Sequence, residues 1–194
     1  ISLGRAGYWI GRAQEALGDP EAAQISYARG AAHQTSFYGL LAAERAGIET
    51  DSALSGTEYF PAWQEADFAQ GDLAKLVALL VKNDQLSLAE QFILKMGEEA
   101  DRTTLGQLGN YALDLGAPHL AVMLGKASVK RGVTLPAHYY ALHPMEAMSF
   151  PVPVEMSLAI ARRESEFDPS VASGAGALGL MQLMSPTAAE VARE

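Results

Sequence analysis

Residues 10–27, IGRAQEALGDPEAAQISY, hold the pattern that decides the fold of this chain. Ala, Leu, Glu and Gln dominate both halves of the stretch, and these residue types mostly favour helices. Gly18, Asp19 and Pro20 interrupt the pattern between the halves. Because Pro20 suits the first turn of a helix and Asp19 is a good N-cap for it, the stretch predicts two helices joined by a tight turn.

Apolar residues on both sides of this turn recur at helical spacing, which predicts helices over residues 5–17 and 20–32. One stripe on the first helix is formed by Ala6, Trp9, Ile10, Ala13 and Leu17. We expect this stripe to face neighbouring helices. The aromatic residues expected in the core are Tyr8, Trp9, Tyr27 and Phe37.

The same pattern returns 98 residues later in the chain. The matching residues are Gly18 and Gly116, Pro20 and Pro118, and Ala23 and Ala121. A weaker copy centres on Asp84 and Ala89. Helix–turn–helix units with periods in the thirties indicate an α-solenoid. The first unit resembles a tetratricopeptide repeat, but its Trp9 stands directly before Ile10 instead of three residues earlier.

The remaining helical patterns divide the chain into regions. Further helices are expected at residues 36–46, 64–83, 86–97, 101–115, 117–131 and 154–167. The linker at 47–63 is a candidate sub-boundary, and closely spaced prolines between residues 136 and 153 exclude a long helix there. We therefore predict a helical solenoid over residues 1–140 and a second domain over 141–194.

Composition excludes several classes of protein. Apolar residues make up 49% of the 194-residue chain and charged residues 19%, which is typical of a packed globular protein. A net charge of −9 without a cluster of Lys or Arg argues against nucleic-acid binding. No apolar run is long enough for a membrane span, and membrane association stays open. The chain has no cysteine, so disulfides and thiolate catalysis are excluded.

Four histidines show no metal-like spacing and are interpreted as structural or surface residues, so no metal site is expected. They are His33, His119, His138 and His143. The chain begins at Ile1 inside a helical pattern and shows no signal peptide, which suggests a piece of a longer protein.

The stretch 157–168, SLAIARRESEFD, contains the first candidate for chemistry. On a helix, Ile160, Ala161 and Phe167 share a face with Glu164. Half-burial among apolar side chains favours the protonated form of a carboxyl group, which can then donate a proton to a glycosidic oxygen. The alternative is a surface glutamate near a helix end, or one that pairs with an arginine.

The stretch 173–184, SGAGALGLMQLM, is a glycine-punctuated loop that enters an apolar turn. Gln182 is a polar residue among Leu and Met, and its amide can donate to and accept from sugar groups. Ser185 and Pro186 then suit the N-cap and the first turn of another helix. A purely structural turn is the alternative.

Taken together, ESEFDP from Glu164 and SGAGALGLMQLMSPTA from Ser173 closely resemble the soluble lytic transglycosylases of bacterial cell walls. The resemblance implies an all-α fold, with an α-superhelical, tetratricopeptide-like solenoid before the first part of a lysozyme-like catalytic domain. It places Glu164 on the catalytic glutamate, Ser173 and Gln182 on saccharide-contacting positions, and Met184 on a groove position. Gly174 departs from the family, in which proline is common there.

The resemblance also implies a reaction. Glu164 would protonate the oxygen of the β-1,4 bond between N-acetylmuramic acid and N-acetylglucosamine, and would then deprotonate the muramyl C6 hydroxyl to give a 1,6-anhydro end. A second carboxylate is not evident, because Glu166 lies about 200° around a helix from Glu164 and Asp168 precedes a proline. No metal or organic cofactor is implied.

Peptidoglycan glycan strands are the implied substrate, other cell-wall enzymes are candidate partners, and the periplasm or cell envelope is the implied location. Two alternatives stay open, a goose-type lysozyme-like hydrolase that uses water and a non-catalytic helical scaffold that binds proteins. The family's downstream groove residues have no counterpart here, so we expect the 194-residue chain alone to be weakly active or inactive.

Overall fold

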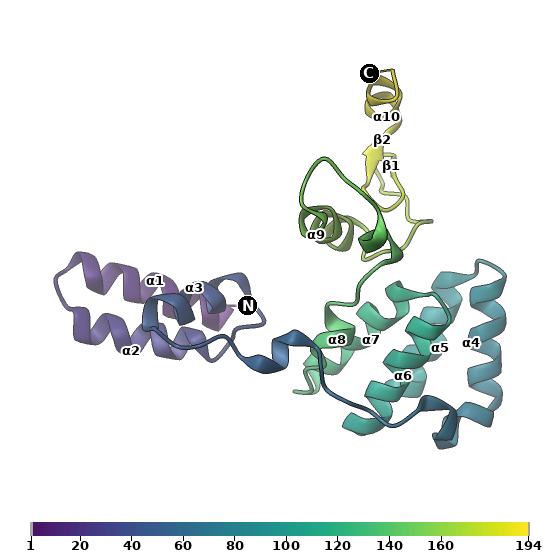
Figure 1. Cartoon of the computed structure of the whole chain (residues 1–194), viewed down its shortest axis with the longest axis horizontal. Helices are drawn as coiled ribbons and strands as arrows, with labels where there is room; N and C mark the ends of the chain where they lie inside the picture. Colours follow the sequence, from purple (N-terminus) through teal and green to yellow (C-terminus); the bar gives the residue numbers. More distant parts are fainter. Residues whose placement is uncertain (1, 194) are drawn as a thin grey trace. The chain divides into compact units, whose positions relative to one another are not determined.

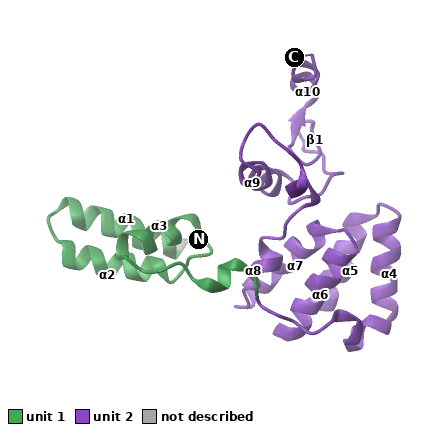
Figure 2. Ribbon diagram, viewed as in Figure 1, with its two compact units in different colours: residues 1–57 green, residues 58–194 purple. Residues whose placement is uncertain are grey.

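The computed structural model describes residues 2–193 and divides the chain into two compact units, Ile1–Thr57 and Glu58–Glu194 (Figure 2). Helices dominate both units (Figure 1). In the described part of the chain the strands are two short ones, β1 (Ala177–Leu178) and β2 (Leu183–Met184). The predicted all-α fold is therefore confirmed.

The first unit contains three α-helices and a short 3₁₀ helix among its described residues. They are α1 (Ser2–Ala16), α2 (Pro20–Ala31), α3 (Phe37–Ala46) and η1 (Ser52–Ser55). Gly18 adopts a φ of 81° between α1 and α2, and the Asp19 carboxylate accepts a hydrogen bond from the Ala22 amide at 3.0 Å. The predicted turn and its N-cap are therefore confirmed.

The buried face of α1 differs from the predicted stripe. Tyr8 and Tyr27 are buried as expected, but Trp9 is 52% exposed and Phe37 is 69% exposed. Ile10 and Leu17 are exposed as well. The residues that α1 buries are Gly4, Gly7, Tyr8 and Gly11. The prediction was wrong because hydrophobic periodicity gives no weight to glycine.

Close backbone approach explains why glycines form this face. A Cβ atom added at Gly7 would lie 2.6 Å from the Gly30 Cα atom, and one added at Gly11 would lie 2.5 Å from the Tyr27 ring. Such distances leave no room for a side chain, so α1 and α2 can pack this closely only with glycine at both positions.

We expect Gly11→Ala to destabilise the first unit by about 1–3 kcal/mol, because the added methyl group must displace the Tyr27 ring from a well-packed site. Unfolding in urea can be followed by fluorine NMR of 5-fluorotryptophan, since Trp9 lies in this unit and Trp63 in the other. Ala13→Leu, which adds volume at an exposed position of the same helix, is the control and should change little. Equal effects of both substitutions would contradict the packing argument.

The second unit begins with two 3₁₀ turns and four longer helices. They are η2 (Trp63–Glu65), η3 (Asp67–Gln70), α4 (Asp72–Lys82), α5 (Leu86–Gly97), α6 (Arg102–Asp114) and α7 (Pro118–Lys130). The last three match their predicted ranges to within one residue at each end. The helix predicted over 64–83 begins only at Asp72. One reason is that the Trp63 indole donates to the Asp114 carboxylate at 2.6 Å, which keeps the segment at Trp63 separate from helix α4.

The remaining elements follow α7 and lead to the C-terminal end. They are α8 (Pro136–Tyr139), η4 (Pro144–Ala147), α9 (Val154–Glu164), β1, β2 and α10 (Ser185–Val191). The proline-rich stretch thus contains only short helical turns, as predicted. No helix among residues 2–193 is both long and apolar enough to cross a membrane.

The sequence repeat corresponds to three helix–turn–helix units. Gly18 and Gly116 have φ values of 81° and 71°, and Asp84 takes the same place with a φ of 56°. Five residues after each of these turn positions lies a buried alanine, and these alanines are Ala23, Ala89 and Ala121. The repeat is confirmed, whereas its assignment as a tetratricopeptide repeat stays a prediction.

One hydrophobic cluster joins the helical array to the C-terminal segment. Val77, Ile93 and Leu120 of the array pack in the same core as Ala161 and Phe167. The two compact units divide between Thr57 and Glu58, within the 47–63 linker, and helices α4 to α7 belong to the same unit as α9. The predicted domain boundary near residue 140 stays a prediction.

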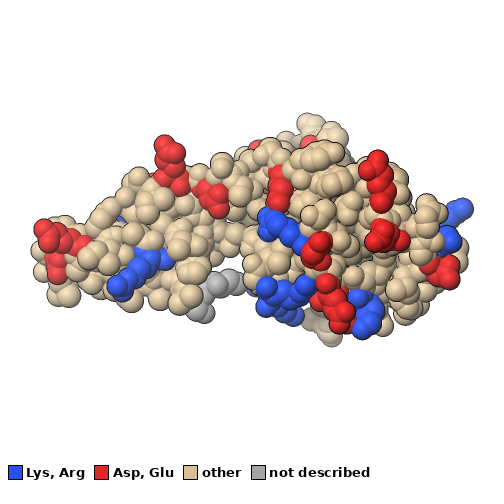
Figure 3. Space-filling model, turned by 90° about the horizontal axis from the view of Figure 1, so that it is seen from below, with Lys and Arg blue, Asp and Glu red and all other residues tan. Residues whose placement is uncertain are grey.

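Acidic and basic side chains are mixed on the surface. On the face drawn in Figure 3, most Lys and Arg side chains lie next to Asp or Glu instead of gathering in a patch of their own. Among residues 2–193, no group of three or more His, Cys, Asp or Glu is placed to hold a metal ion.

His138 is a fully buried histidine in the second unit. Its Nε2 atom lies 2.9 Å from the Asn110 Oδ1 atom, and its Nδ1 atom has no hydrogen-bond partner. Burial lowers the pKa of His138 from its ordinary value of 6.5 to about 4, against a smaller opposing effect of the Glu58 carboxylate. Protonation would place a charged N–H in a site that offers it no acceptor.

This burial makes the stability of the second unit depend on pH. Between pH 6.5 and 4 the unfolded chain binds a proton at His138 that the folded chain does not, so stability falls as the pH falls through this range. We expect the loss from this group to reach about 3 kcal/mol. Urea unfolding at pH 7 and pH 4 measures it, and His138→Gln should show a smaller difference. An equal difference in both proteins would refute the assignment.

Candidate active site

Helix α9 carries the candidate acid and is anchored to α8. The guanidinium of Arg162 donates two hydrogen bonds to the Tyr139 carbonyl oxygen, at 3.1 and 2.7 Å. The same group lies 4.8 Å from the ring centroid of Tyr139 and 5.1 Å from that of Tyr140. Bidentate hydrogen bonding combined with cation–π stacking orients α9 about this contact.

Helix α9 ends at Glu164, three residues earlier than predicted. Ser165 is the C-cap, and Glu166 and Phe167 follow with φ values of 53° and 66°. Phe167 turns into the core and is 2% exposed. Because Phe167 lies outside the helix, it does not share a helix face with Glu164.

Glu164 is exposed, so the expected half-burial among apolar side chains was wrong. Within residues 2–193 its carboxylate forms no hydrogen bond or ion pair. The nearby acidic side chains differ: Glu166 pairs with Lys126, and Asp168 accepts hydrogen bonds from the amide and hydroxyl of Ser170 at 2.8 and 2.6 Å. The expectation of Asp168 as a turn residue agrees with these contacts. Among Glu164, Glu166 and Asp168, only Glu164 has a carboxylate that is available to a ligand.

Backbone strain gathers around this segment. Four non-glycine residues in the described part of the chain have positive φ, and Glu166, Phe167 and Gln182 are three of them. The left-handed region costs roughly 1–2 kcal/mol per non-glycine residue, so the surroundings must hold these residues in place. Strain of this kind clusters at functional sites.

The loop after α9 is closed by Ser173. Its hydroxyl accepts a hydrogen bond from the Ala177 amide at 3.0 Å, and its own amide donates to the Ala177 carbonyl at 2.9 Å. β1 then pairs antiparallel with β2, with Ala177 opposite Met184 and Leu178 opposite Leu183. Ser173 is exposed and Met184 is 42% exposed.

Gln182 is half-buried and has a φ of 47°. Its amide nitrogen donates to the carbonyl oxygens of Val171 and Gly179, at 3.1 and 3.0 Å. The side chain therefore holds the loop closed through its donor. Its Oε1 atom forms no hydrogen bond within residues 2–193, so it can still accept one from a ligand.

Ser165 connects the helix end to the loop. Its hydroxyl lies 3.0 Å from the Ala161 carbonyl oxygen and 2.9 Å from the Leu180 carbonyl oxygen. The residue after Glu164 is thereby joined to a residue two positions before Gln182. In the described residues, no hydrogen bond joins Glu164 to Ser173, Gln182 or Met184.

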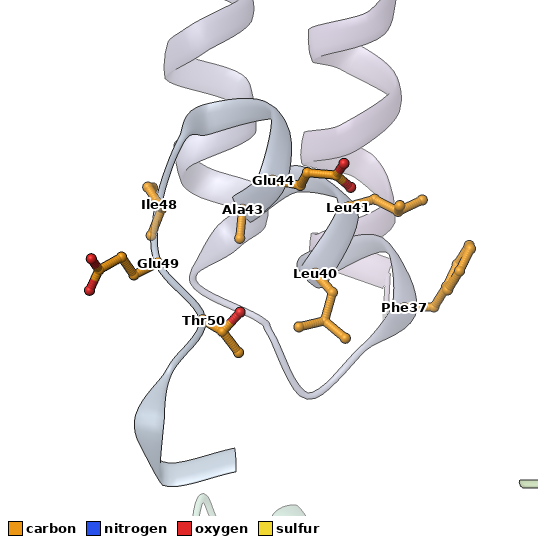
Figure 4. Close-up of a pocket in the computed structure, with 8 residues that line it drawn as sticks. All are labelled: Phe37, Leu40, Leu41, Ala43, Glu44, Ile48, Glu49 and Thr50. Carbon is orange, nitrogen blue, oxygen red and sulfur yellow. The ribbon is translucent and has the colours of Figure 1, made fainter. Parts of the chain in front are cut away.

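The first unit contains a surface hollow, which is a second place where a ligand could bind (Figure 4). It has a volume of about 520 Å³ and is lined mainly by apolar residues of α3 and the segment after it. Figure 4 shows Glu44 and Glu49 pointing to opposite sides, so the hollow does not bring carboxylates together. The strained segment of the second unit is the better candidate for chemistry.

Comparison with known proteins identifies this segment. Residues 144–194 match the family model of the transglycosylase SLT domain. The match covers residues 144–194, which are therefore called the SLT segment. The resemblance inferred from the two motif stretches is confirmed.

Similarity to curated proteins extends well beyond the SLT segment. The soluble lytic murein transglycosylase of Escherichia coli K12 is 29% identical over 161 residues, which cover 80% of this chain and 24% of the relative. The protein of the same name from E. coli O157:H7 matches equally. The chain thus spans about a quarter of the length of these curated relatives.

Two solved structures have a fold similar to that of this chain. The crystal structure of the 70 kDa soluble lytic transglycosylase from E. coli superposes with a TM-score of 0.77 and 22% identity, over 99% of this chain and 31% of that one. The complex of the 70 kDa soluble lytic transglycosylase with bulgecin A gives a TM-score of 0.77 and 23% identity, over 98% of this chain and 31% of that one.

Two residues that contact the SLT segment lie outside it. His119 and Lys126, both on α7, bind the main chain and the side chain of Glu166. Sequence reasoning treated His119 as structural and did not single out Lys126. No local signal could have found them, because their role depends on α7 packing against a segment about 40 residues further on.

Proposed function

We propose that the intact protein is a lytic transglycosylase that acts on murein. It cleaves the β-1,4 bond between N-acetylmuramic acid and N-acetylglucosamine and leaves 1,6-anhydro ends, with Glu164 as acid and then base. The observation that carries the proposal is the isolation of Glu164 at the end of α9. It is exposed and unpaired within residues 2–193, whereas Glu166 and Asp168 are engaged by Lys126 and Ser170.

A single free carboxylate suits this reaction. Protonated Glu164 donates its proton to the glycosidic oxygen, and the bond from that oxygen to muramyl C1 breaks. The resulting carboxylate takes the proton of the C6 hydroxyl, and O6 bonds to C1. An intramolecular nucleophile reaches effective molarities of about 10⁵–10⁸ M, so no second carboxylate is needed to activate water.

Substrate binding supplies the environment that the free chain lacks. A glycan strand lying over the end of α9 brings its glycosidic oxygen within reach of the Glu164 carboxyl group and excludes bulk water from it. Ser173 and the free Oε1 atom of Gln182 are the proposed sugar contacts, and Met184 offers apolar surface to the groove. Murein as substrate places the proposed site of action in the cell envelope.

The products separate this proposal from its nearest alternative, a lysozyme-like hydrolase with the same acid. Purified murein should be incubated with the intact protein, and the released muropeptides analysed by mass spectrometry. We expect anhydro products, which are lighter by one water than hydrolysis products. Release of reducing-end muropeptides alone would favour the hydrolase, and no release at all would refute both.

A further inference from the structure

We propose that helix α7 positions the catalytic acid, through a clamp formed by His119 and Lys126 with Glu90 behind His119. This clamp holds Glu166, two residues after Glu164, and so sets the end of α9. The inference rests on the proposed role of Glu164 in glycan cleavage. His119 and Lys126 are positioning residues, since their contacts are with Glu166 and not with the acid itself.

The turn that the clamp holds would not be stable on its own. Glu166 and Phe167 are consecutive residues with φ values of 53° and 66°, a conformation that L-residues rarely adopt even singly. It persists only where contacts from elsewhere over-determine it. If the turn relaxed, the last residues of α9 would be free to extend the helix or to fray.

His119 holds the main chain of this turn. Its Nδ1 atom lies 2.9 Å from the Glu166 carbonyl oxygen, and its Nε2 atom lies 3.2 Å from a carboxylate oxygen of Glu90 on α5. A carbonyl oxygen can only accept a hydrogen bond, so Nδ1 donates to the Glu166 carbonyl while Nε2 faces Glu90. The side chain is 7% exposed, and both of its nitrogens are used.

Lys126 holds the side chain of the same residue. Its ammonium group forms an ion pair with the Glu166 carboxylate, about two turns further along α7 than His119. The two side chains are 38% and 30% exposed, so solvent weakens this contact relative to the buried one. Glu166 is therefore held at its carbonyl by a buried group and at its carboxylate by a partly exposed one.

The geometry predicts an effect on catalysis that differs from the effect of a simple packing defect. A displaced acid slows the chemical step, and a misplacement of about 1 Å can cost on the order of 10²-fold in rate. Substrate binding depends on the whole groove, so it should change little. Loss of the clamp should therefore lower kcat while leaving KM nearly unchanged.

Two substitutions at His119 test the contact in the intact protein, with soluble uncrosslinked glycan strands as substrate. The amide nitrogen of His119→Asn replaces Nδ1 and keeps the bond to Glu166, whereas that of His119→Gln replaces Nε2 and faces Glu90. We expect kcat close to the unmodified value for His119→Asn and a fall of about 10- to 100-fold for His119→Gln. Equal losses in both variants, or a change confined to KM, would overturn the proposal.

A second measurement follows the turn itself in the 194-residue chain, without any substrate. The amides of Ser165, Glu166 and Asp168 donate to the Ala161, Arg162 and Ser165 carbonyls, so their hydrogen exchange reports on the turn. His119→Gln should accelerate exchange at these amides and His119→Asn should not. Unchanged exchange in His119→Gln would refute the clamp.

The contribution of Lys126 has a matched control. Lys126→Met should accelerate exchange at the same amides, less than His119→Gln does, while Lys95→Met should leave them unchanged because Lys95 pairs with exposed Glu98, far along the sequence from this turn. If the unmodified intact protein released no murein fragments, the proposed function would fail. The exchange measurement would still decide whether the clamp exists.

Discussion

Glu164→Gln is expected to abolish most murein cleavage by the intact protein. An amide can neither donate a proton to the glycosidic oxygen nor take one from the C6 hydroxyl, and one general acid–base function is worth about 10²- to 10⁴-fold in rate. Since Glu164 is proposed to perform both transfers, the loss should lie at the upper end of this range or beyond. Mass spectrometry of released anhydro-muropeptides measures it.

The same substitution should leave the fold intact. Glu164 is exposed and unpaired within residues 2–193, so its replacement removes no hydrogen bond or ion pair among these residues, and the melting temperature should stay unchanged. Glu155→Gln is the matched control, because Glu155 is an exposed glutamate in the first turn of the same helix. It should retain full activity. Cleavage by Glu164→Gln at the rate of Glu155→Gln would exclude Glu164 as the catalyst.

Phe167→Ala is expected to destabilise the second unit by about 3–5 kcal/mol. The ring is 2% exposed and packs in the core that joins the helical array to α9. Truncation removes its apolar contacts and leaves a cavity, and alanine still has to occupy the strained backbone conformation. Urea unfolding followed by the fluorine signal of 5-fluorotryptophan at Trp63, in the same unit, measures the change.

Phe37→Ala provides the matched comparison. It is the same substitution at a ring that is 69% exposed, so we expect a change within about 0.5 kcal/mol, reported by Trp9 in the first unit. The pair also separates two interpretations of the sequence, because helical periodicity placed Phe37 in the core. A larger effect at Phe37 than at Phe167 would mean that the observed burial does not govern stability.

The two large effects concern neighbouring residues with different roles. Phe167 fixes the turn to the core, while Glu164 projects from the end of α9 into solvent. A catalytic group must reach its substrate, so the structure obtains rigidity from residues that follow the acid. Phe167→Ala should therefore reduce activity indirectly, through unfolding or a loosened turn. It should unfold at temperatures where Glu164→Gln remains folded.

Local chemistry determined much of this protein. Gly18 and Gly116 end helices because glycine adopts positive φ without a steric penalty, and Pro20 and Pro118 begin helices because proline suits the first turn. These effects act within a few residues, so the sequence alone predicted the helix–turn–helix repeats. The order of residues in the two motif stretches likewise indicated the family.

Tertiary contacts decided what local chemistry could not. Which face of α1 is buried depends on how closely α2 approaches Gly7 and Gly11. The end of α9 at Glu164 depends on Phe167 entering a core built by earlier helices, which overrides the tendency of the helix to continue. Helical periodicity describes one helix at a time, whereas burial, strain and the hold of α7 on Glu166 arise between segments far apart in the chain.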